Sequence, residues 1–338
     1  MDKKKILKYL LNIDHIEKNW FLRYGITKRR KDSLLKCSDH KGSLFNTNSE
    51  STLSLFMFGN IDRWTQLEIE DILPRKRNSR WNPDFFQNLE KSNLSNIEMM
   101  KGKKETYWQD LKLAEIFKVK KESLKNNILL FEVEFYNKNL HGNGNKKDNI
   151  SFLDIKDQNS WTRYDVVIIF PDEKKFVFIE SKYKSDISTT TKHFPKIGQM
   201  IRGLETAFLT TNHHNSRYSD WDFTYIMLGQ KLLDDYSLTK YNNKLDDLGS
   251  MLVKYNDRLN KKYRSSTNED CYPHYFGKFI KKVPKRVKKL YWKDLGNIIK
   301  KQEPRFFSDY FKKLEEGSFD KRTVNRFKLK LREAGIHF

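Results

Sequence analysis

The order of predicted elements in the middle of the chain indicates an α/β fold with a mixed sheet. Apolar residues recur at helical spacing over 107–117, and three strand-like segments follow at 128–135, 162–170 and 174–182. A second helical pattern then leads into another strand. Strands that alternate with helices in this way predict a sheet with helices packed on it. We therefore expect one α/β core, flanked by mostly helical N- and C-terminal regions.

The first hundred residues are predicted to form an accessory region that is only partly helical. Amphipathic spacing at 6–13 predicts a helix, the polar segment 38–52 predicts a loop, and 53–73 is again partly helical. We place the boundary of this region at residue 100, so that it spans 1–100 and the core spans 101–240.

Two adjacent segments of the core have the strongest strand pattern in the chain. Residues 162–170 (TRYDVVIIF) and 174–182 (KKFVFIESK) are rich in β-branched and aromatic side chains, and the sequence PDEK lies at their junction. Such a short polar connection predicts an antiparallel hairpin. Helical spacing at 197–208 and a strand at 223–228 complete the predicted core.

The remaining residues, 241–338, are predicted to be basic and helical. Helices are expected at 291–301, 304–316 and 319–334, because Pro304 suits a first turn and glycines follow the second and third segments. Residues 276–338 hold 19 Lys or Arg against 7 Asp or Glu. Phosphate contacts from such cations supply affinity without reading base sequence. The predicted nucleic-acid-binding residues are Lys281, Lys282, Lys285, Arg286, Lys288 and Lys289.

The charge of the whole chain points to the same class of partner. The sequence has 66 Lys or Arg against 44 Asp or Glu, a formal net charge of +22, and such a field concentrates polyanions around the protein. A Lys-rich but merely solvated surface is the alternative, and the basic C-terminal helices could equally form a bundle with a charged face. No run of about 20 apolar residues or signal peptide is seen, so no membrane partner and a cytoplasmic location are expected.

Three charged residues of the hairpin carry the predicted chemistry. If the turn is centred on Asp172 and Glu173, paired residues have numbers that sum to 345, so Asp165 lies opposite Glu180 with Lys182 as its diagonal neighbour. Two carboxylates and an ammonium group then form one cluster. A loop longer by one residue would move Asp165 to the other face, and an exposed cross-strand ion pattern is the structural alternative.

This cluster suits metal-assisted hydrolysis of a phosphodiester. Asp165 and Glu180 could share a hard cation such as Mg²⁺ or Mn²⁺, which would polarise a phosphate and activate water. Lys182 could orient that water, act as its base if its pKa is depressed, or stabilise charge on the phosphorane. No phosphate-binding GxxxxGK[ST] motif occurs, so an ATP motor is not expected.

An Asp on one strand followed by Glu-x-Lys on the next, inside an αβββαβ order, resembles the PD-(D/E)XK nuclease superfamily. The resemblance covers residues 107–229 and implies a restriction-endonuclease-like core. It implies that Asp165 and Glu180 bind the metal and that Lys182 is the superfamily's lysine. Tyr164 stands where many members have proline.

The resemblance also implies supporting residues around the trio. Members often add an acid from the preceding helix or first strand, for which Glu115, Glu132 and Glu134 are candidates, and some carry a glutamine on the following helix, for which Gln199 with Arg202 is the candidate. Plain surface acids and a solvated helix face are the alternative interpretations.

Together these patterns predict a Mg²⁺-dependent endonuclease that acts on DNA, and a defence or restriction role fits the resemblance. The alternatives are a nucleic-acid-binding subunit without turnover and a nuclease directed at RNA. A homodimer, or a protein partner in a defence complex, is compatible with the sequence.

Overall fold

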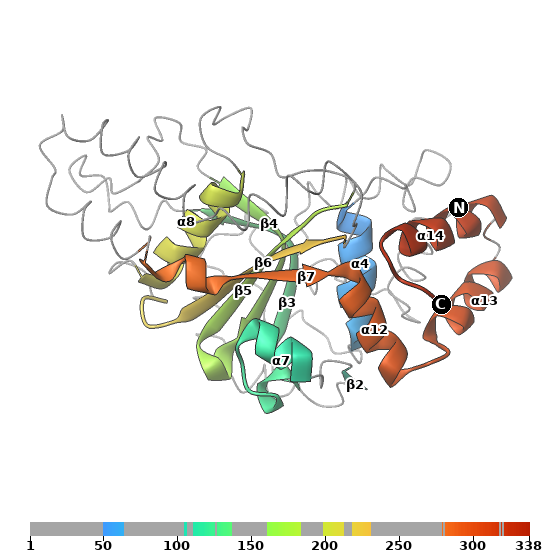
Figure 1. Cartoon of the computed structure of the whole chain (residues 1–338), viewed down its shortest axis with the longest axis horizontal. Coiled ribbons are helices and arrows are strands. Elements are labelled where there is room, and N and C mark those ends of the chain that lie inside the picture. Colours follow the sequence, from blue (N-terminus) through green and yellow to red (C-terminus); the bar gives the residue numbers. More distant parts are fainter. Residues whose placement is uncertain are drawn as a thin grey trace, which may run out of the picture.

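The computed structural model shows a sheet surrounded by helices, with three helices of the C-terminal segment stacked at one end (Figure 1). The predicted helix at 6–13 lies outside the described residues. So do residues 107–110 of the predicted helix at 107–117. The described residues are 50–63, 105–106, 111–125, 127–136, 161–183, 199–212, 218–230, 279, 281–317, 319 and 321–338.

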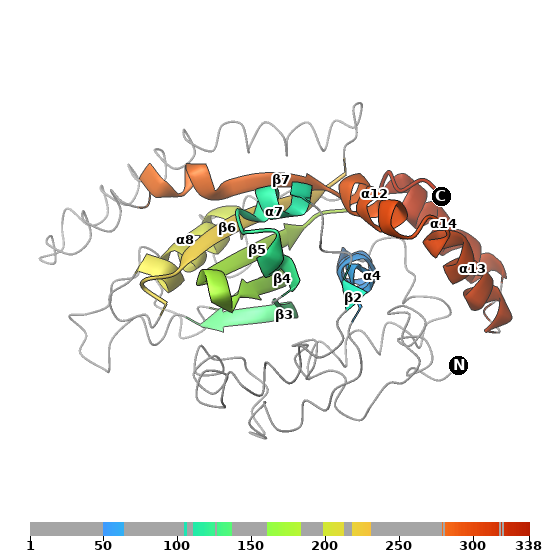
Figure 2. The same ribbon diagram turned by 90° about the horizontal axis from the view of Figure 1, so that it is seen from below.

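Five strands form one mixed sheet in the order β3-β4-β5-β6-β7. β3, β4 and β5 are antiparallel neighbours, whereas β6 runs parallel to β5 and β7 parallel to β6. Figure 2 shows β3 and β7 at opposite edges of this sheet. The mixed sheet with packed helices confirms the predicted α/β class. The strands are Ile128–Tyr136 (β3), Trp161–Phe170 (β4), Lys175–Ser181 (β5), Asp222–Gly229 (β6) and Val287–Tyr291 (β7).

The β4–β5 hairpin has the register predicted from its sequence. Phe170 pairs with Lys175 and Val166 with Ile179, which is the expected pairing for a turn at residues 171–174. The turn itself is a short 3-10 helix, Pro171–Glu173 (η4). All residues of β5 are buried, as expected for a central strand that is covered on both faces.

Helix α8, Gln199–Asn212, packs against β4 and β6 on one face of the sheet. Gly203 permits this close approach, because a Cβ there would lie 2.7 Å from the hydroxyl oxygen of Tyr225. The carbonyl of Gly203 accepts a hydrogen bond of 2.6 Å from the Tyr164 hydroxyl. Tyr164 also packs on Phe178, with ring centroids 4.6 Å apart.

The main hydrophobic core includes the other face of the sheet, α4, α7 and the C-terminal helices. Helix α4, Glu50–Ile61 (ESTLSLFMFGNI), is apolar around most of its circumference, which is typical of a buried helix. Its Leu53 and Phe56 are fully buried, and α4 contacts β4, β5 and α12. The N-terminal part of this segment was predicted as loop, and that prediction is wrong for residues 50–52.

The three predicted C-terminal helices are confirmed, with bounds of Trp292–Gln302 (α12), Phe306–Glu316 (α13) and Lys321–Glu333 (α14). Their buried faces join the same core as α4 and the sheet. Strand β7, which directly precedes α12, was not predicted. The division of the chain at residues 100 and 240 stays a prediction, but the segment after 240 supplies both a strand and core helices.

Shorter elements complete the described part. Helix α7, Leu111–Phe117, packs its Phe117 ring on Phe170 at the hairpin end of the sheet, with centroids 6.0 Å apart. None of the helices in the described ranges is long and apolar enough to cross a membrane. The small elements are β1 (Asp62–Arg63), β2 (Glu105–Thr106), η2 (Glu122–Lys125) and η5 (Pro284–Arg286).

Candidate active site

The centre of the candidate site is the end of strand β5. Glu180 and Lys182 are only 3% and 5% exposed, and the Lys182 ammonium Nζ lies 2.7 Å from Glu180 Oε1. The two side chains therefore share one side, as their spacing predicts. A buried ion pair is costly to desolvate. Such a pair is therefore unusual at the end of a strand whose other residues are mostly apolar.

Asp165 also belongs to this cluster, but its backbone is not paired with Glu180 as predicted. The β4–β5 pairing ends at Val166 and Ile179, so a directly opposed Asp165–Glu180 pair is not formed. Instead, Asp165 Oδ2 accepts a hydrogen bond of 2.7 Å from the backbone N–H of Ser181. The carboxylate takes the place of a backbone carbonyl where the two strands part.

The strand alternation is interrupted at this point. Tyr164 packs toward α8, against Phe178, whereas Val166, two residues later, belongs to the core on the other face. In a regular strand these two side chains would share a face. The predicted directly opposed pair of Asp165 and Glu180 is therefore not formed, although the register on which it was based is correct.

A third carboxylate, Glu50, joins the cluster from the first turn of α4. Glu50 Oε1 accepts the backbone N–H of Tyr183 at 3.1 Å, and its Oε2 lies 3.9 Å from Lys182 Nζ. Helix α4 is held against β5 by a buried hydrogen bond of 2.9 Å from the Ser54 hydroxyl to the Ser181 hydroxyl. Glu50 was not predicted as a site residue.

The electrostatics of the cluster centre on Lys182. Burial alone would lower the pKa of its ammonium group, but the carboxylates of Glu180, Glu50 and Asp165 outweigh burial and raise that pKa above its usual range. Lys182 is therefore charged at neutral pH in this arrangement. With these carboxylates beside it, the ammonium form suits roles in orientation and charge stabilisation.

The charge and the oxygen atoms of the cluster suit a divalent cation. Three carboxylates and one ammonium give the cluster a formal charge of −2, which a divalent cation would neutralise. Within the described ranges, no group of three or more His, Cys, Asp or Glu is arranged to hold a metal ion. Mg²⁺ commonly binds through one or two carboxylates and completes its octahedron with water and substrate phosphate. Asp165 and Glu180 fit that requirement.

The supporting candidates have different positions. Glu115 is exposed on α7, whose last residue, Phe117, accepts the Thr224 hydroxyl near the start of β6. This is the end of the sheet away from Glu180, so Glu115 is not part of the site. Among the described helices that precede β3, α4 places an acid, Glu50, beside Lys182.

The remaining supporting candidates are placed by the backbone only. Glu132 lies between the pairs Phe131–Val166 and Val133–Tyr164, which puts it beside Asp165 in the neighbouring strand. Glu134 pairs with Arg163, two residues further along the strand from the site. Gln199 and Arg202 both lie in the first turn of α8. Their side chains, like those of the two glutamates, are outside the described part.

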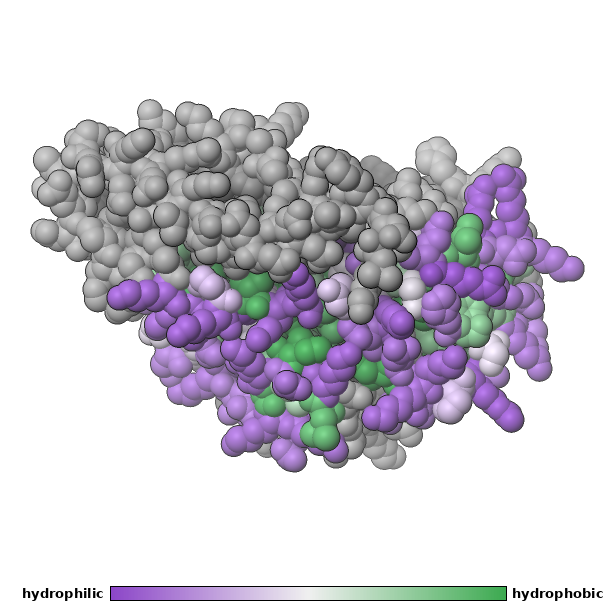
Figure 3. Space-filling model, in the orientation of Figure 1, coloured by the Kyte–Doolittle hydropathy of each residue, from purple (hydrophilic) through white to green (hydrophobic). Residues whose placement is uncertain are grey.

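Some of the predicted phosphate-binding cations already have protein partners. Arg286 forms an ion pair with Asp222, and Lys282 Nζ donates to Asn212 Oδ1 at 3.0 Å. Lys281 and Lys285 are exposed, whereas Lys288 and Lys289 on the edge strand β7 are half-buried. In the view of Figure 3, the described surface is mostly hydrophilic, with apolar patches near its centre.

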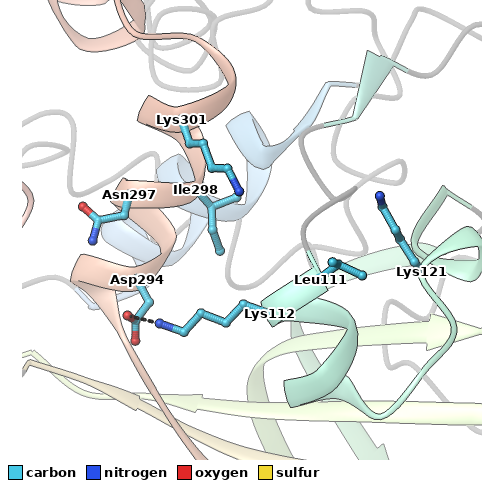
Figure 4. Close-up of a pocket in the computed structure, with 7 residues that line it drawn as sticks. All are labelled: Leu111, Lys112, Lys121, Asp294, Asn297, Ile298 and Lys301. Atoms are coloured by element: carbon cyan, nitrogen blue, oxygen red, sulfur yellow. Dashed lines mark hydrogen bonds and ion pairs between the residues drawn. The ribbon is translucent and has the colours of Figure 1, made fainter.

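A separate hollow of about 440 Å³ lies between α7 and α12. Figure 4 shows Lys112 reaching from α7 to Asp294 of α12, where the ion pair measures 2.6 Å. Lys121 and Lys301 add two more cations to its rim. None of the predicted catalytic residues lines this hollow, so its cations could at most assist in holding a polyanion.

No known protein family, no curated protein and no solved structure matches this chain. The chemistry of the cluster at the end of β5 therefore has to indicate the function. Of its four members, three were predicted from the hairpin sequence. The fourth, Glu50, had only one local indication, an acid placed just before an apolar run, where a helix N-terminus favours negative charge.

Proposed function

We propose that this protein is a metal-dependent nuclease of the PD-(D/E)XK type, which hydrolyses phosphodiester bonds in DNA. The observation that carries the proposal is the buried pair of Glu180 and Lys182, with the partly buried carboxylates of Asp165 and Glu50 beside it. A fold gains little stability from burying one ion pair beside two further carboxylates. Sites with such costly arrangements are usually functional.

The strand order supports the same proposal. An antiparallel meander, β3-β4-β5, continues through α8 into the parallel strand β6. This is the βββαβ portion of the order that the resemblance implies. The helix before it that contributes to the site is α4, whose first residue is Glu50.

The residues divide the chemistry between them. Asp165 and Glu180 would hold the cation, which supplies Lewis acidity toward the phosphate and lowers the pKa of water. Lys182, held as an ammonium by its carboxylate neighbours, would donate to a phosphate oxygen and stabilise the charge that develops on it. Glu50, which already binds the backbone of Tyr183, would hold the lysine in place.

The net charge makes a polyanionic substrate reasonable. A protein with a formal charge of +22 attracts nucleic acid of either kind through its phosphates. Cations near β7 and α7 could hold the backbone while the acidic cluster recruits the metal. The choice of DNA as the substrate rests on the resemblance. The cleavage test described next also includes RNA, so it distinguishes the two substrates.

The test is incubation of the purified chain with plasmid DNA, linear DNA and RNA, each with Mg²⁺, Mn²⁺ or EDTA. We expect cleavage of DNA with either metal and none with EDTA. The matched variant is Glu180→Gln, which keeps the size of the side chain but removes a ligand charge. It should lose cleavage while keeping a cooperative thermal transition. Cleavage that persists in folded Glu180→Gln would contradict the assignment.

A further inference from the structure

The residue that follows the lysine of the site joins it to the C-terminal helix α14. Tyr183 is 2% exposed, and its hydroxyl donates a hydrogen bond of 2.6 Å to Glu333 Oε2 near the end of α14. Its backbone N–H donates to Glu50 Oε1 at 3.1 Å. One residue therefore contacts a site carboxylate through its backbone and the C-terminal helix through its side chain.

Three further contacts fix this junction. The Trp292 indole N–H at the start of α12 donates to the carbonyl of Lys182 at 3.0 Å, and the Lys182 N–H donates to the carbonyl of Leu228 at 2.7 Å. The Gln230 amide donates to the carbonyl of Glu333 at 2.7 Å. The backbone of Lys182 is thereby held from both α12 and β6.

A buried cation packs on the same tyrosine. Lys330, which has no exposed surface, places its Nζ 5.3 Å from the centre of the Tyr183 ring. Lys330 and Glu333 are three residues apart on α14, so both lie on one side of the helix. α14 thus presents a cation to the ring of Tyr183 and a carboxylate to its hydroxyl.

From this arrangement we propose that Tyr183 and Glu333 are positioning residues, which set Glu50 and Lys182 in the active cluster. The inference rests on the proposed nuclease function for its kinetic effect, but the positioning itself is independent of turnover. α14 then belongs to the active site as a support and is not only a basic surface for phosphates. The physical reason is that loss of either partner removes the hydrogen bond that ties the segment after Lys182 to α14, and a shift of that segment lowers the cost of burying the polar group that remains.

The test compares single-atom changes at two buried tyrosines. Tyr183→Phe removes the hydroxyl that binds Glu333 but keeps the ring on which Lys330 packs. The matched control is Tyr310→Phe on α13, because among the described residues the Tyr310 hydroxyl is buried without a hydrogen-bond partner. Glu333→Ala removes the acceptor, and Glu333→Gln retains an acceptor oxygen, so the glutamine variant should restore the wild-type behaviour.

Two readouts are measured for each variant that shows a cooperative thermal transition. The first is the acylation rate of Lys182 by acetic anhydride, followed by mass spectrometry against Lys312, whose side chain is 76% exposed. The second is the steady-state kinetics of DNA cleavage. We expect Tyr183→Phe and Glu333→Ala to speed Lys182 acylation and to lower kcat about tenfold at unchanged KM, as for loss of one hydrogen bond to a charged group.

Glu333→Gln and Tyr310→Phe should match the wild type in both readouts. If folded Tyr183→Phe and Glu333→Ala are acylated and turn over like Tyr310→Phe, the positioning role is wrong. If acylation changes as expected but no form of the protein cleaves nucleic acid, the positioning stands and the proposed function fails.

Discussion

Two buried lysines lie at opposite ends of strand β5: Lys175 is its first residue, and Lys182 follows its last residue. The net charge around one lysine differs in sign from the net charge around the other. Lys175 and Lys182 are 4% and 5% exposed, and about 20 Å of strand separates them. At the hairpin end, Lys175 shares Asp222 with Arg286. At the other end, Lys182 is faced by three carboxylates. The first end has surplus positive charge and the second has surplus negative charge.

Under the proposed function, this difference distinguishes the structural ion pairs of Asp222 from the candidate active site around Lys182. Partial burial and the nearby cations Lys288 and Lys175 lower the pKa of Lys118, which shows how crowded the positive end is. One acid, Asp222, is enough to hold Lys175 and Arg286 together. The carboxylates around Lys182 exceed what one ammonium needs, and that excess can recruit a divalent cation.

The largest expected effect comes from exchanging each buried lysine for methionine. Lys182→Met should lower DNA cleavage by about a thousandfold or more, because it removes the charge that stabilises the reacting phosphate. Lys175→Met should keep nearly full cleavage and lose about 1 kcal/mol of unfolding free energy, since Asp222 still has Arg286. Cleavage assays and urea unfolding measure the two effects. Equal loss of cleavage in both variants would remove the contrast between the two ends.

A smaller loss is expected when the third carboxylate is neutralised. Glu50→Gln keeps an oxygen that can accept the Tyr183 N–H but removes one charge from the surroundings of Lys182. We expect kcat to fall about 10- to 100-fold, the range seen when a supporting group of a metal site is changed. The control is Glu115→Gln on the exposed face of α7, which should cleave like the wild type. Identical rates for the two variants would place Glu50 outside the site.

The positive end should affect binding more than chemistry. Changing Lys281, Lys285 and Lys288 together to Gln should flatten the log–log salt dependence of DNA affinity by about 2–3 units, provided each contacts a phosphate. Arg286→Gln alone should change the slope by less than about one unit, because Arg286 is already paired with Asp222. Fluorescence anisotropy with duplex DNA at several salt concentrations measures both. A larger slope change for Arg286→Gln would reverse this ranking.

The smallest effect concerns acid stability at the hairpin end. Burial would raise the pKa of Asp222, but Lys175 and Arg286 outweigh it and hold that pKa below its usual range. A lowered folded pKa stabilises the protein above the ordinary aspartate pKa of about 3.9, and the contribution is lost as pH falls through the folded value. Because the side chain is 43% exposed, we expect less than about 1 kcal/mol.

Urea unfolding of the wild type and Asp222→Asn from about pH 6 to about pH 3 tests this sign. The stability difference between the two proteins should be constant near neutrality and shrink toward the acid end. A difference that grows on acidification would mean that the ion pair does not stabilise the fold.

The hairpin could be predicted from its sequence because its information is local. The register of two strands follows from the turn between them, and the four residues PDEK define the length of that turn. The predicted pairs Phe170–Lys175 and Val166–Ile179 were therefore correct. The C-terminal helices were predictable for a similar reason, since their apolar spacing and glycine stops are properties of short segments.

The features that were missed depend on distant contacts. Strand β7 has the sequence VKKLY, whose two lysines suggest a basic surface. An edge strand can tolerate such charges, because only one side of it is paired. Helix α4 shows no clear apolar stripe, because apolar residues lie around most of its circumference. Asp165 is not directly opposite Glu180, because the pairing of the two strands ends at the residue next to it. A register counted from the turn does not predict where the pairing ends.

The residues of the candidate site are far apart in sequence, and this determines when the site can form during synthesis. Glu50 and Tyr183 are 133 residues apart in sequence, and Tyr183 and Glu333 are 150 apart. A nascent chain that has emerged only as far as β6 contains Glu50, Asp165, Glu180 and Lys182 but lacks α12 and α14, which contact the backbone of Lys182 and the side chain of Tyr183. Under the proposed function, a polypeptide still attached to the ribosome should cut nucleic acid more slowly than one in which α12 and α14 have docked, because the contacts of these helices with Lys182 and Tyr183 form late.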